Sequence, residues 1–400
     1  MIKIIDKKTC CGCTACAAIC PKKCIKMVED HEGFLYPEVN TDKCVNCKAC
    51  EKVCPISNLS KDEVNEQKAY IVQNKDEKVL RESTAGGAFT AIARYVLQQG
   101  GVVFGVEMSE DLVARHVCVE TEEELVKFRN SKYVQSVVGM STFRKVAEFL
   151  KQKRMVCFSG TPCQIEGLKK YLNKEYENLV TVDVVCRAVP SPLIFRKYVE
   201  YQNSKLSDTV KKIRFRDKYY GYKYSTLNLT TERNQGNYHQ GVETDPWLRA
   251  FFSNICDRPS CHACKFRKRY RISDFTIWDC FQVGRYSKNL DNDKGATRIL
   301  IHSDKGCKIF EKIKTDFQYI ETAPESIMDT AKEMKESVLP NKRRKQFFED
   351  ANQLSGTELF EKYFPSTLKT KAEHFIRISC YKLGIYSVAK KVYVKLTGKY

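Results

Sequence analysis

One spacing of cysteines occurs twice near the N-terminus, and it constrains the chain more than any other feature. The pattern is C-x2-C-x2-C-x3-C followed by proline, and its cysteines are Cys10, Cys13, Cys16 and Cys20 in the first copy and Cys44, Cys47, Cys50 and Cys54 in the second. Three thiolates at intervals of three residues surround one corner of a cubic iron–sulfur cluster, which needs a fourth ligand from elsewhere. The repeat therefore predicts two [4Fe–4S] clusters.

The proline after each copy indicates where the fourth cysteine binds. The x3 step and the proline carry that cysteine out of its own loop, as in bacterial two-cluster ferredoxins. We expect cluster one to be held by Cys10, Cys13, Cys16 and Cys54, and cluster two by Cys44, Cys47, Cys50 and Cys20. Two zinc sites are the alternative, but zinc needs only two CxxC pairs, so the doubled triplets favour iron and sulfur. Cys11 and Cys24 fall outside the pattern and are predicted to be packing residues near the clusters.

The surroundings of the cysteines indicate a compartment. No apolar signal core precedes Cys10, and the apolar stretch 95–106 is too short to span a membrane. We therefore expect a cytoplasmic protein. In a reducing compartment, 20 cysteines at short spacings favour metal sites over disulfides.

A loop after the first predicted strand of the body carries hydroxyls and glycines. It covers residues 83–89, follows a strand at 69–73 and leads into an apolar helix. Backbone N–H groups at such a helix start can bind a phosphate. A plain N-cap by Ser83 or Thr84 is an equal alternative.

A second loop joins a strand at 155–158 to a helix at 164–171, and a further strand at 179–185 ends at Cys186. This order places Cys163 and Cys186 at the ends of two strands, at the edge where open α/β sheets bind ligands. At its helix N-terminus Cys163 should have a lowered pKa, which suits a metal-binding thiolate. Cys157 lies inside the strand and is predicted to be in the core.

A later CxxC pair consists of Cys261 and Cys264. Such a pair alone is ambiguous among zinc, a redox dithiol and a cluster. Together with Cys163 and Cys186 it makes four cysteines, the number that a third [4Fe–4S] cluster requires. Cys256 and Cys280 are near enough in the sequence to be substitutes.

Several short motifs follow one another along the chain. They are STAGGAF at 83–89, SKYVQS at 131–136, GTPCQ at 160–164, VPSP at 189–192 after Cys186, FRDK at 215–218, RPSCHAC at 258–264 and RISD at 271–274. In this order they resemble the coenzyme F420 hydrogenase/dehydrogenase beta-subunit family, with an N-terminal two-[4Fe–4S] ferredoxin domain fused in front.

The resemblance implies an oxidoreductase with a bound FAD beside an iron–sulfur cluster. A ferredoxin head handles single electrons and a deazaflavin or nicotinamide handles hydride, so a flavin is the natural converter between them. Flavin contacts carry over onto Ser83, Thr84, Gly86, Gly87, Ser131, Lys132, Tyr133, Gln135, Thr161 and Pro162. Lys132 would offer its ammonium to a phosphate or to a reduced flavin; a surface lysine is its alternative role. No residue is assigned as catalytic.

The substrate side departs from the family pattern. Cys186 is followed by Arg187-Ala188 where the family commonly has His-Gly, and residues 278–282 read WDCFQ where it commonly has GDFWG. Coenzyme F420 itself is therefore not assumed. Relatives with a ferredoxin head also resemble proteins of cell-surface polysaccharide loci, which would make the chain a reductase in polysaccharide biosynthesis. A non-catalytic electron-transfer subunit of a larger complex is the alternative.

These features together predict an α+β chain of three parts. We expect a bacterial-type two-cluster ferredoxin head over 1–60, an α/β mixed-sheet flavin-binding body over 66–320, and a helical basic C-terminal region over 321–400. A charged linker at 57–67 separates the head from the body.

The net charge is +19, and much of it lies near the C-terminus, where residues after Pro365 include eight Lys or Arg but only one acidic residue, Glu373. Apolar residues interleave with these charges at helical spacing: Phe375, Ile376, Ile378, Tyr381, Leu383, Ile385, Val388, Val392 and Leu396. Such a helix either packs its apolar face on the body, which we favour, or lies on an anionic membrane surface. The basic run 342–345 is predicted to be a solvated face, and contact with an anionic partner or a phosphate-bearing substrate is the alternative.

The cysteines and the charge also predict the partners. We expect a redox partner protein or reduced ferredoxin, an anionic hydride carrier or substrate and, under the membrane alternative, peripheral contact at the inner face of the membrane. Nucleic-acid binding is the alternative of another class, because the isoelectric point is about 9.1. No nucleic-acid-binding module is recognised and the cysteine spacing is that of electron transfer, so we expect no nucleic acid.

Overall fold

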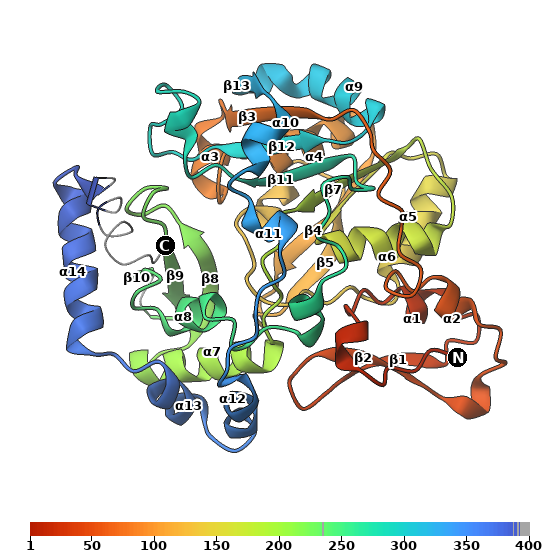
Figure 1. Cartoon of the computed structure of the whole chain (residues 1–400), viewed down its shortest axis with the longest axis horizontal. Coiled ribbons are helices and arrows are strands. Elements are labelled where there is room, and N and C mark those ends of the chain that lie inside the picture. The colour runs from red at the N-terminus through yellow and green to blue at the C-terminus, as the bar shows by residue number, and fades with distance from the viewer. Residues whose placement is uncertain (234–235, 387, 390–391, 393–400) are drawn as a thin grey trace.

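The structure is a computed structural model that describes residues 1–233, 236–386, 388–389 and 392. A mixed sheet of eight strands lies at its centre (Figure 1), which confirms the mixed α/β fold. In the order β13-β3-β12-β11-β7-β6-β4-β5, the sheet contains β3 (Lys68–Asn74), β4 (Val102–Met108), β5 (Ala114–Val119), β6 (Val156–Gly160), β7 (Leu179–Val184), β11 (Phe275–Asp279), β12 (Thr297–Ile301) and β13 (Phe317–Thr322). Strands β4, β6, β7 and β11 run parallel, and the other pairs are antiparallel.

Helices cover both faces of this sheet because its strands are apolar on both sides. In β3, Tyr70 and Val72 join one apolar cluster while Ala69 and Ile71 join another, as alternation along a strand requires. The first face is covered by α4 (Ala88–Gln98) and α9 (Asp304–Ile313), and the second by α5 (Thr142–Lys151), α6 (Pro162–Leu172), α10 (Pro324–Met328) and α11 (Lys332–Lys335). A short helix, α3 (Glu77–Glu82), follows β3.

A second layer is built on a small antiparallel sheet in the order β10-β9-β8. Its elements are β8 (Val210–Asp217), β9 (Thr226–Thr231) and β10 (Tyr238–Gln240), with the helices α7 (Pro192–Leu206), α8 (Pro246–Phe252), α12 (Arg344–Ala351), α13 (Gly356–Tyr363) and α14 (Leu368–Lys382). The fully buried Trp247 lies in its core, and the Tyr198 hydroxyl donates to Asp245 at 2.7 Å. The C-terminal part is therefore helical, as predicted.

The head consists of a hairpin and two short helices, and it packs closely on the body (Figure 1). Its elements are α1 (Ala15–Ile19), β1 (Ile25–Glu29), β2 (Leu35–Val39) and α2 (Ala49–Lys52). Phe34 is fully buried in an apolar cluster that also contains body residues. Gly33, at a φ of +85°, turns the hairpin so close to α7 that a Cβ would lie 2.4 Å from the Cβ of Leu193.

Polar contacts also hold the head and the linker to the body. The ammonium of Lys268 donates to the carbonyl of Ser60 at 2.6 Å and pairs with Asp62 at 2.9 Å. Arg344 binds both carboxylate oxygens of Glu32, at 2.7 and 2.6 Å. The prediction that the basic run 342–345 is only a solvated face is therefore wrong for Arg344, which a head carboxylate holds.

The orientation of α14 differs from the one that we favoured. Phe375, Ile376 and Leu383 are exposed, whereas His374 and Tyr381 make the contacts to the rest of the chain. The prediction that this helix packs its apolar face on the body is wrong for those three residues. The predicted position Leu396 lies outside the described residues. Within the described part of the chain, none of the helices combines the length and the apolar character needed to cross a bilayer.

Candidate redox centre

The cysteines expected to hold cluster one lie together around a hollow in the head. Cys10, Cys13, Cys16 and Cys54 line it, so the last cysteine of the second run joins the first three of the other run. Burial raises the pKa of the Cys16 thiol to about 12. On the body side, Gly167 of α6 makes room for Cys13, since a Cβ there would lie 2.8 Å from the Cβ of Cys13.

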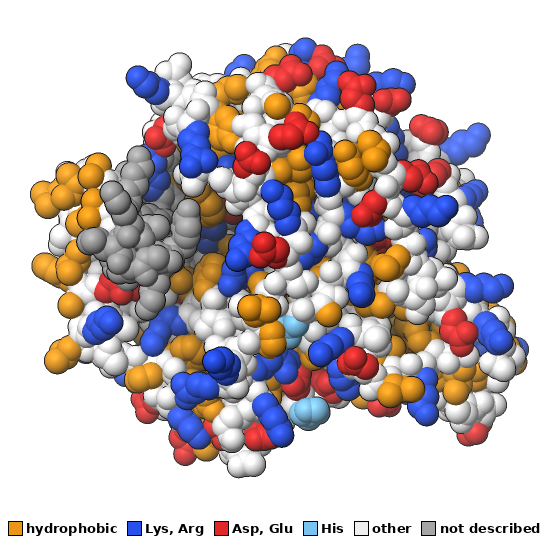
Figure 2. All heavy atoms as spheres, viewed as in Figure 1, with side chains coloured by type: hydrophobic (Ala, Val, Ile, Leu, Met, Phe, Trp, Pro, Cys, Tyr) orange, Lys and Arg blue, Asp and Glu red, His pale blue; other side chains and the backbone are white. Residues whose placement is uncertain are grey.

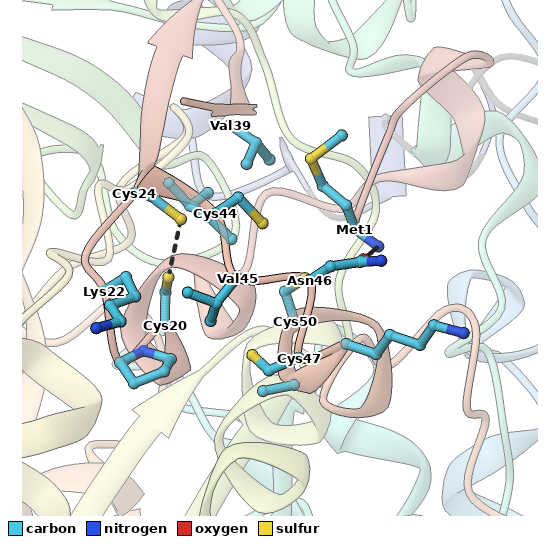
Figure 3. A pocket seen from close by; sticks show the side chains of 14 residues that line it. Met1, Cys20, Lys22, Cys24, Val39, Cys44, Val45, Asn46, Cys47 and Cys50 are labelled. Atoms are coloured by element: carbon cyan, nitrogen blue, oxygen red, sulfur yellow. Dashed lines mark hydrogen bonds between the residues drawn. The ribbon is translucent and has the colours of Figure 1, made fainter. Parts of the chain in front are cut away.

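The cysteines expected to hold cluster two surround a second hollow, shown in Figure 3. They are Cys20, Cys44, Cys47 and Cys50, and Cys47 is exposed at the surface. Cys24 also lines this hollow, with its Sγ 3.4 Å from that of Cys20 (Figure 3). Across the residues that the structure describes, no three His, Cys, Asp or Glu side chains are grouped for a single metal ion.

A third hollow is lined by the four cysteines that come from separate parts of the body. Cys163 follows β6, Cys186 follows β7, and Cys261 and Cys264 lie in and just after the turn at Pro259–Ala263. Strands β6 and β7 are parallel neighbours, so the first two cysteines meet at the same sheet edge. The alternatives Cys256 and Cys280 are buried in apolar clusters and do not line this hollow.

Cys163 does not have the lowered pKa that its place at a helix N-terminus predicts. A hydrogen bond with Cys11 and the burial of the thiol raise its pKa well above the usual value. Burial likewise raises the pKa of Cys186. Deprotonation of these thiols therefore requires a compensating positive charge, such as the iron of a cluster.

Cys11 lies between the head and the third hollow. It lines both the hollow of cluster one and the third hollow, and its thiol is hydrogen-bonded to Cys163. From the sequence, Cys11 is predicted to have only a packing role because it falls outside the ligand spacing. Its position beside Cys10 was a signal for a place near cluster one, but nothing in the spacing connects it to Cys163.

Arg258 is the buried cation at the same junction, and only 1% of it is exposed. Its guanidinium donates to the carbonyls of Cys10 and Leu35, at 2.9 and 3.0 Å, and lies 3.7 Å from the Cys10 Sγ. It also donates to the Gln135 side chain at 2.9 Å and stacks 4.3 Å from the ring centre of Tyr36. In the sequence, Arg258 stands out only as the first residue of the motif at 258–264, and nothing there predicts its contacts with the head.

The two segments predicted to contact the flavin phosphates lie side by side. The Thr84 hydroxyl accepts a hydrogen bond from the Ser131 amide at 2.8 Å, and the two hydroxyls are 3.0 Å apart. Gly87, at a φ of +76°, is the N-cap residue of α4, and no side chain caps that helix. The alternative of an N-cap by Ser83 or Thr84 is therefore wrong, and the first N–H groups of α4 lack a side-chain acceptor.

Gly86 has a role in packing the loop against the sheet. Its amide donates to the Thr297 hydroxyl at 2.8 Å, and a Cβ there would lie 2.3 Å from the Val72 carbonyl oxygen. Its small size thus lets the loop pass between β3 and β12.

Basic residues gather around these two segments. The Lys218 ammonium donates to three backbone carbonyls, among them that of Ala85 at 2.7 Å. The Lys132 ammonium donates to the carbonyls of Lys127 and Arg129, and burial, with the charge of Arg214, lowers its pKa to about 7. Lys132 is thus half-buried rather than a surface lysine.

The remaining predicted flavin residues lie elsewhere. Tyr133 stacks on Phe251 at 4.8 Å, whereas Gln135 holds Arg258 at the head junction. Thr161 and Pro162 line the third hollow. The stretch 131–136 links both places, because Ser131 meets the first loop and Ser136 accepts a hydrogen bond from Gln164 of α6 at 3.0 Å. The predicted flavin contacts thus form two groups joined by one segment.

Models of known protein families match most of the chain and show its family. The model for the C terminus of the coenzyme F420 hydrogenase/dehydrogenase beta subunit matches residues 153–327, and the model for the N-terminal part of the same subunit matches residues 69–142. The chain belongs to this beta-subunit family. A 4Fe-4S dicluster domain matches residues 9–58, which include both cysteine runs. This beta-subunit family member is thus an iron–sulfur protein of the oxidoreductase, electron-transfer type.

The chain is also similar to solved structures. A chain of the xenon-derivatised F420-reducing [NiFe] hydrogenase complex from Methanosarcina barkeri is 18% identical to this family member, with a TM-score of 0.43 over 74% of this chain and 89% of that chain. No curated protein matches this family member.

Proposed function

We propose that this protein is an iron–sulfur flavoprotein oxidoreductase that takes single electrons from a redox partner at its head and exchanges a hydride with an anionic carrier or substrate at its body. One observation carries this proposal: Cys11 and Ile56 of the head line the same hollow as the four body cysteines. Single electrons thus have a short route from the head into the body.

The third hollow fits a [4Fe–4S] cluster by its donor set. Four thiols, without a carboxylate ligand among them, favour iron–sulfur over a hard cation. Arg258, Arg267 and Arg271 also line the hollow and would offset the negative charge of thiolates. Arg271 is held in place by Asp183, at 2.8 Å, in a buried ion pair. We propose Cys163, Cys186, Cys261 and Cys264 as the four ligands.

The two segments at Ser83–Gly87 and Ser131–Tyr133 fit a dinucleotide by their donors. The uncapped start of α4 and the ammonium of Lys132 can bind phosphate. The stretch 131–136, which would be about 20 Å long if extended, could follow a dinucleotide along its length. We propose that FAD binds there and extends toward Thr161 and Pro162. A flavin would supply the exchange between one-electron and hydride transfer.

The nature of the carrier or substrate is proposed from charge. Arg187, which stands where the family commonly has His, lines the third hollow together with Lys265 and Arg267. Glu333 also lines this hollow and pairs with Arg187 at 3.4 Å, but the cations outnumber it, which favours an anionic molecule. We propose a cytoplasmic reductase of an anionic intermediate, and the resemblance to proteins of polysaccharide loci suggests an intermediate of that biosynthesis.

The test is performed on the anaerobically reconstituted full chain. We expect bound FAD and about twelve iron atoms per chain, as three [4Fe–4S] clusters require. In the Cys186→Ser variant the iron content should fall to about eight, while Cys307→Ser, which alters a cysteine outside the hollows, should retain about twelve. Bleaching of the flavin by F420H2, NADH or reduced ferredoxin would identify the donor. Absence of bound flavin would contradict the proposal.

Lys132 should make FAD binding depend on pH. Its pKa of about 7 means that the ammonium is neutralised as the pH rises through this value, while only the protonated form attracts a phosphate. We expect the affinity for FAD to fall with rising pH above about 7, by at most about tenfold per pH unit. Calorimetric titration of the apoprotein measures this.

The control for this pH dependence is Lys127→Met. Lys127 is a nearby lysine that pairs with Glu124 at 2.7 Å on the surface. The Lys132→Met variant should bind FAD more weakly and with a flat pH profile, whereas the control should keep the wild-type profile. If the affinity of Lys132→Met for FAD falls with rising pH as steeply as that of the wild type, another group titrates.

A further inference from the structure

One face of helix α14 is apolar and unpartnered. We call it the outer stripe, and its residues are Leu368, Ala372, Phe375 and Ile376 of the helix and Leu383, the residue just after it. At 86%, 72%, 59% and 72% exposure respectively, Leu368, Phe375, Ile376 and Leu383 lie open to solvent. Figure 2 shows hydrophobic side chains gathered along the outer edge of the molecule where α14 lies. Large apolar side chains grouped in this way on a surface mark a binding face.

Polar contacts on the opposite side of α14 fix this orientation. His374 lies 2.8 Å from the buried carboxylate of Glu243, and the Tyr381 hydroxyl donates to Asp293 at 3.2 Å. Although burial opposes it, hydrogen bonds from His374 and Tyr224 hold the pKa of Glu243 below its usual value. The helix therefore turns its polar side to the body and its apolar side outward, the reverse of an ordinary surface helix.

Basic side chains accompany the outer stripe. Lys369, Lys371 and Lys382 are exposed on the same helix. The one acidic residue of α14, Glu373, is bound by Arg377 at 2.7 Å, so it does not oppose them. Apolar side chains flanked by lysines are the composition of helices that lie in the interface of an anionic bilayer.

We propose that the outer stripe of α14 is a peripheral binding site for an anionic lipid surface. The excess of positive charge, +19 for the chain, is complementary to such a surface. A second copy of the chain fits less well, because a symmetric contact through this helix would bring Lys369, Lys371 and Lys382 of both copies together. This inference is independent of the proposed redox chemistry.

The experiment is flotation of the full chain with vesicles. Vesicles of phosphatidylcholine with phosphatidylglycerol should carry the protein upward, whereas vesicles of phosphatidylcholine alone should not. The double variant Phe375→Ser/Ile376→Ser should bind the anionic vesicles more weakly by about tenfold or by a larger factor, because two large apolar side chains no longer enter the interface. The matched control is Leu339→Ser, which alters a leucine that is 80% exposed outside α14.

A second pair of variants tests the charge. Lys369→Gln/Lys371→Gln/Lys382→Gln should weaken binding, whereas Lys151→Gln/Lys332→Gln/Lys345→Gln removes the same charge from other exposed positions and should not. Equal iron content and circular dichroism would show that each variant is folded.

Three results would overturn the proposal. One is wild-type protein that stays unbound with anionic vesicles. Another is equal flotation of the wild type and the Phe375→Ser/Ile376→Ser variant. The third is concentration-dependent self-association in sedimentation, lost in that variant and unaccompanied by vesicle binding, which would assign the outer stripe to a second copy.

Discussion

Replacing Arg258 with methionine should lower the reduction potential of cluster one by about 100 mV and loosen the head from the body. A buried cation 3.7 Å from the Cys10 sulfur stabilises the more negative, reduced form of the cluster. At an effective dielectric constant near 20, a unit charge roughly 7 Å from the cluster contributes about 2.3 kcal/mol, which corresponds to about 100 mV for one electron. An EPR-monitored redox titration measures the shift.

The same substitution leaves three buried acceptors without a donor, on Cys10, Leu35 and Gln135. We expect a loss of about 3 kcal/mol in the stability of the docked head, because each lost hydrogen bond to a charged group costs about 1.5–3 kcal/mol and water recovers part of it. Faster proteolysis within the linker 57–67 would report the loosening.

Two control variants separate charge from docking. Arg258→Lys keeps the charge but cannot reproduce the planar set of donors, so the potential should change little while proteolysis is faster. Arg144 also joins body and head, since it donates to the Ala18 carbonyl at 2.9 Å, but it makes no hydrogen bond to a cysteine of cluster one. Arg144→Gln should therefore leave the potential unchanged. An equal shift in Arg144→Gln would mean that docking, rather than the cation, sets the potential.

Replacing Cys54 with alanine should remove cluster one and leave cluster two intact. Cys54 lines the hollow of the first run, although it lies four residues after Cys50 in the second run. The variant should lose about four iron atoms per chain and one set of EPR signals, because a cubic cluster needs its fourth thiolate. Iron quantitation and EPR of the reduced protein measure this.

The matching variant is Cys20→Ala, which should remove cluster two instead. Cys20 lines the other hollow with Cys44, Cys47 and Cys50. Combining each single variant with Cys13→Ala distinguishes the sites: Cys54→Ala/Cys13→Ala should lose no more iron than Cys54→Ala alone, whereas Cys20→Ala/Cys13→Ala should lose about eight atoms. Equal losses in both double variants would contradict the crossed arrangement.

The sequence was most informative where the chemistry is local. The x2 and x3 spacings place the head cysteines around two hollows because each run forms one loop. The strand–loop–helix order around Cys163 places Cys186 just after the next strand. The meeting of these two cysteines with Cys261 and Cys264 was predictable only by counting cysteines. Their place around one hollow depends on the packing of the turn at 259–263 against the sheet edge, which no local pattern encodes.

Long-range contacts could not be predicted in this way. Arg258 and Cys10 are 248 positions apart, and no periodicity links them. The orientation of α14 was predicted wrongly because an amphipathic pattern shows only that two faces differ. Which face turns inward depends on partners such as Glu243 and Asp293, which lie far away in the sequence.

The docking of the head has a consequence for the kinetics of electron delivery. The head is covalently joined to the body and packed on it. The proposed electron transfer from cluster one into the body therefore has a rate that does not depend on protein concentration. Under the proposed function only the encounter with an external donor is bimolecular, and we expect it where Cys47 reaches the surface. Lys22 and Lys48 lie at that place, so an acidic donor protein would be selected there. Donor preference can thus change through a few head residues while the chemistry of the body is preserved.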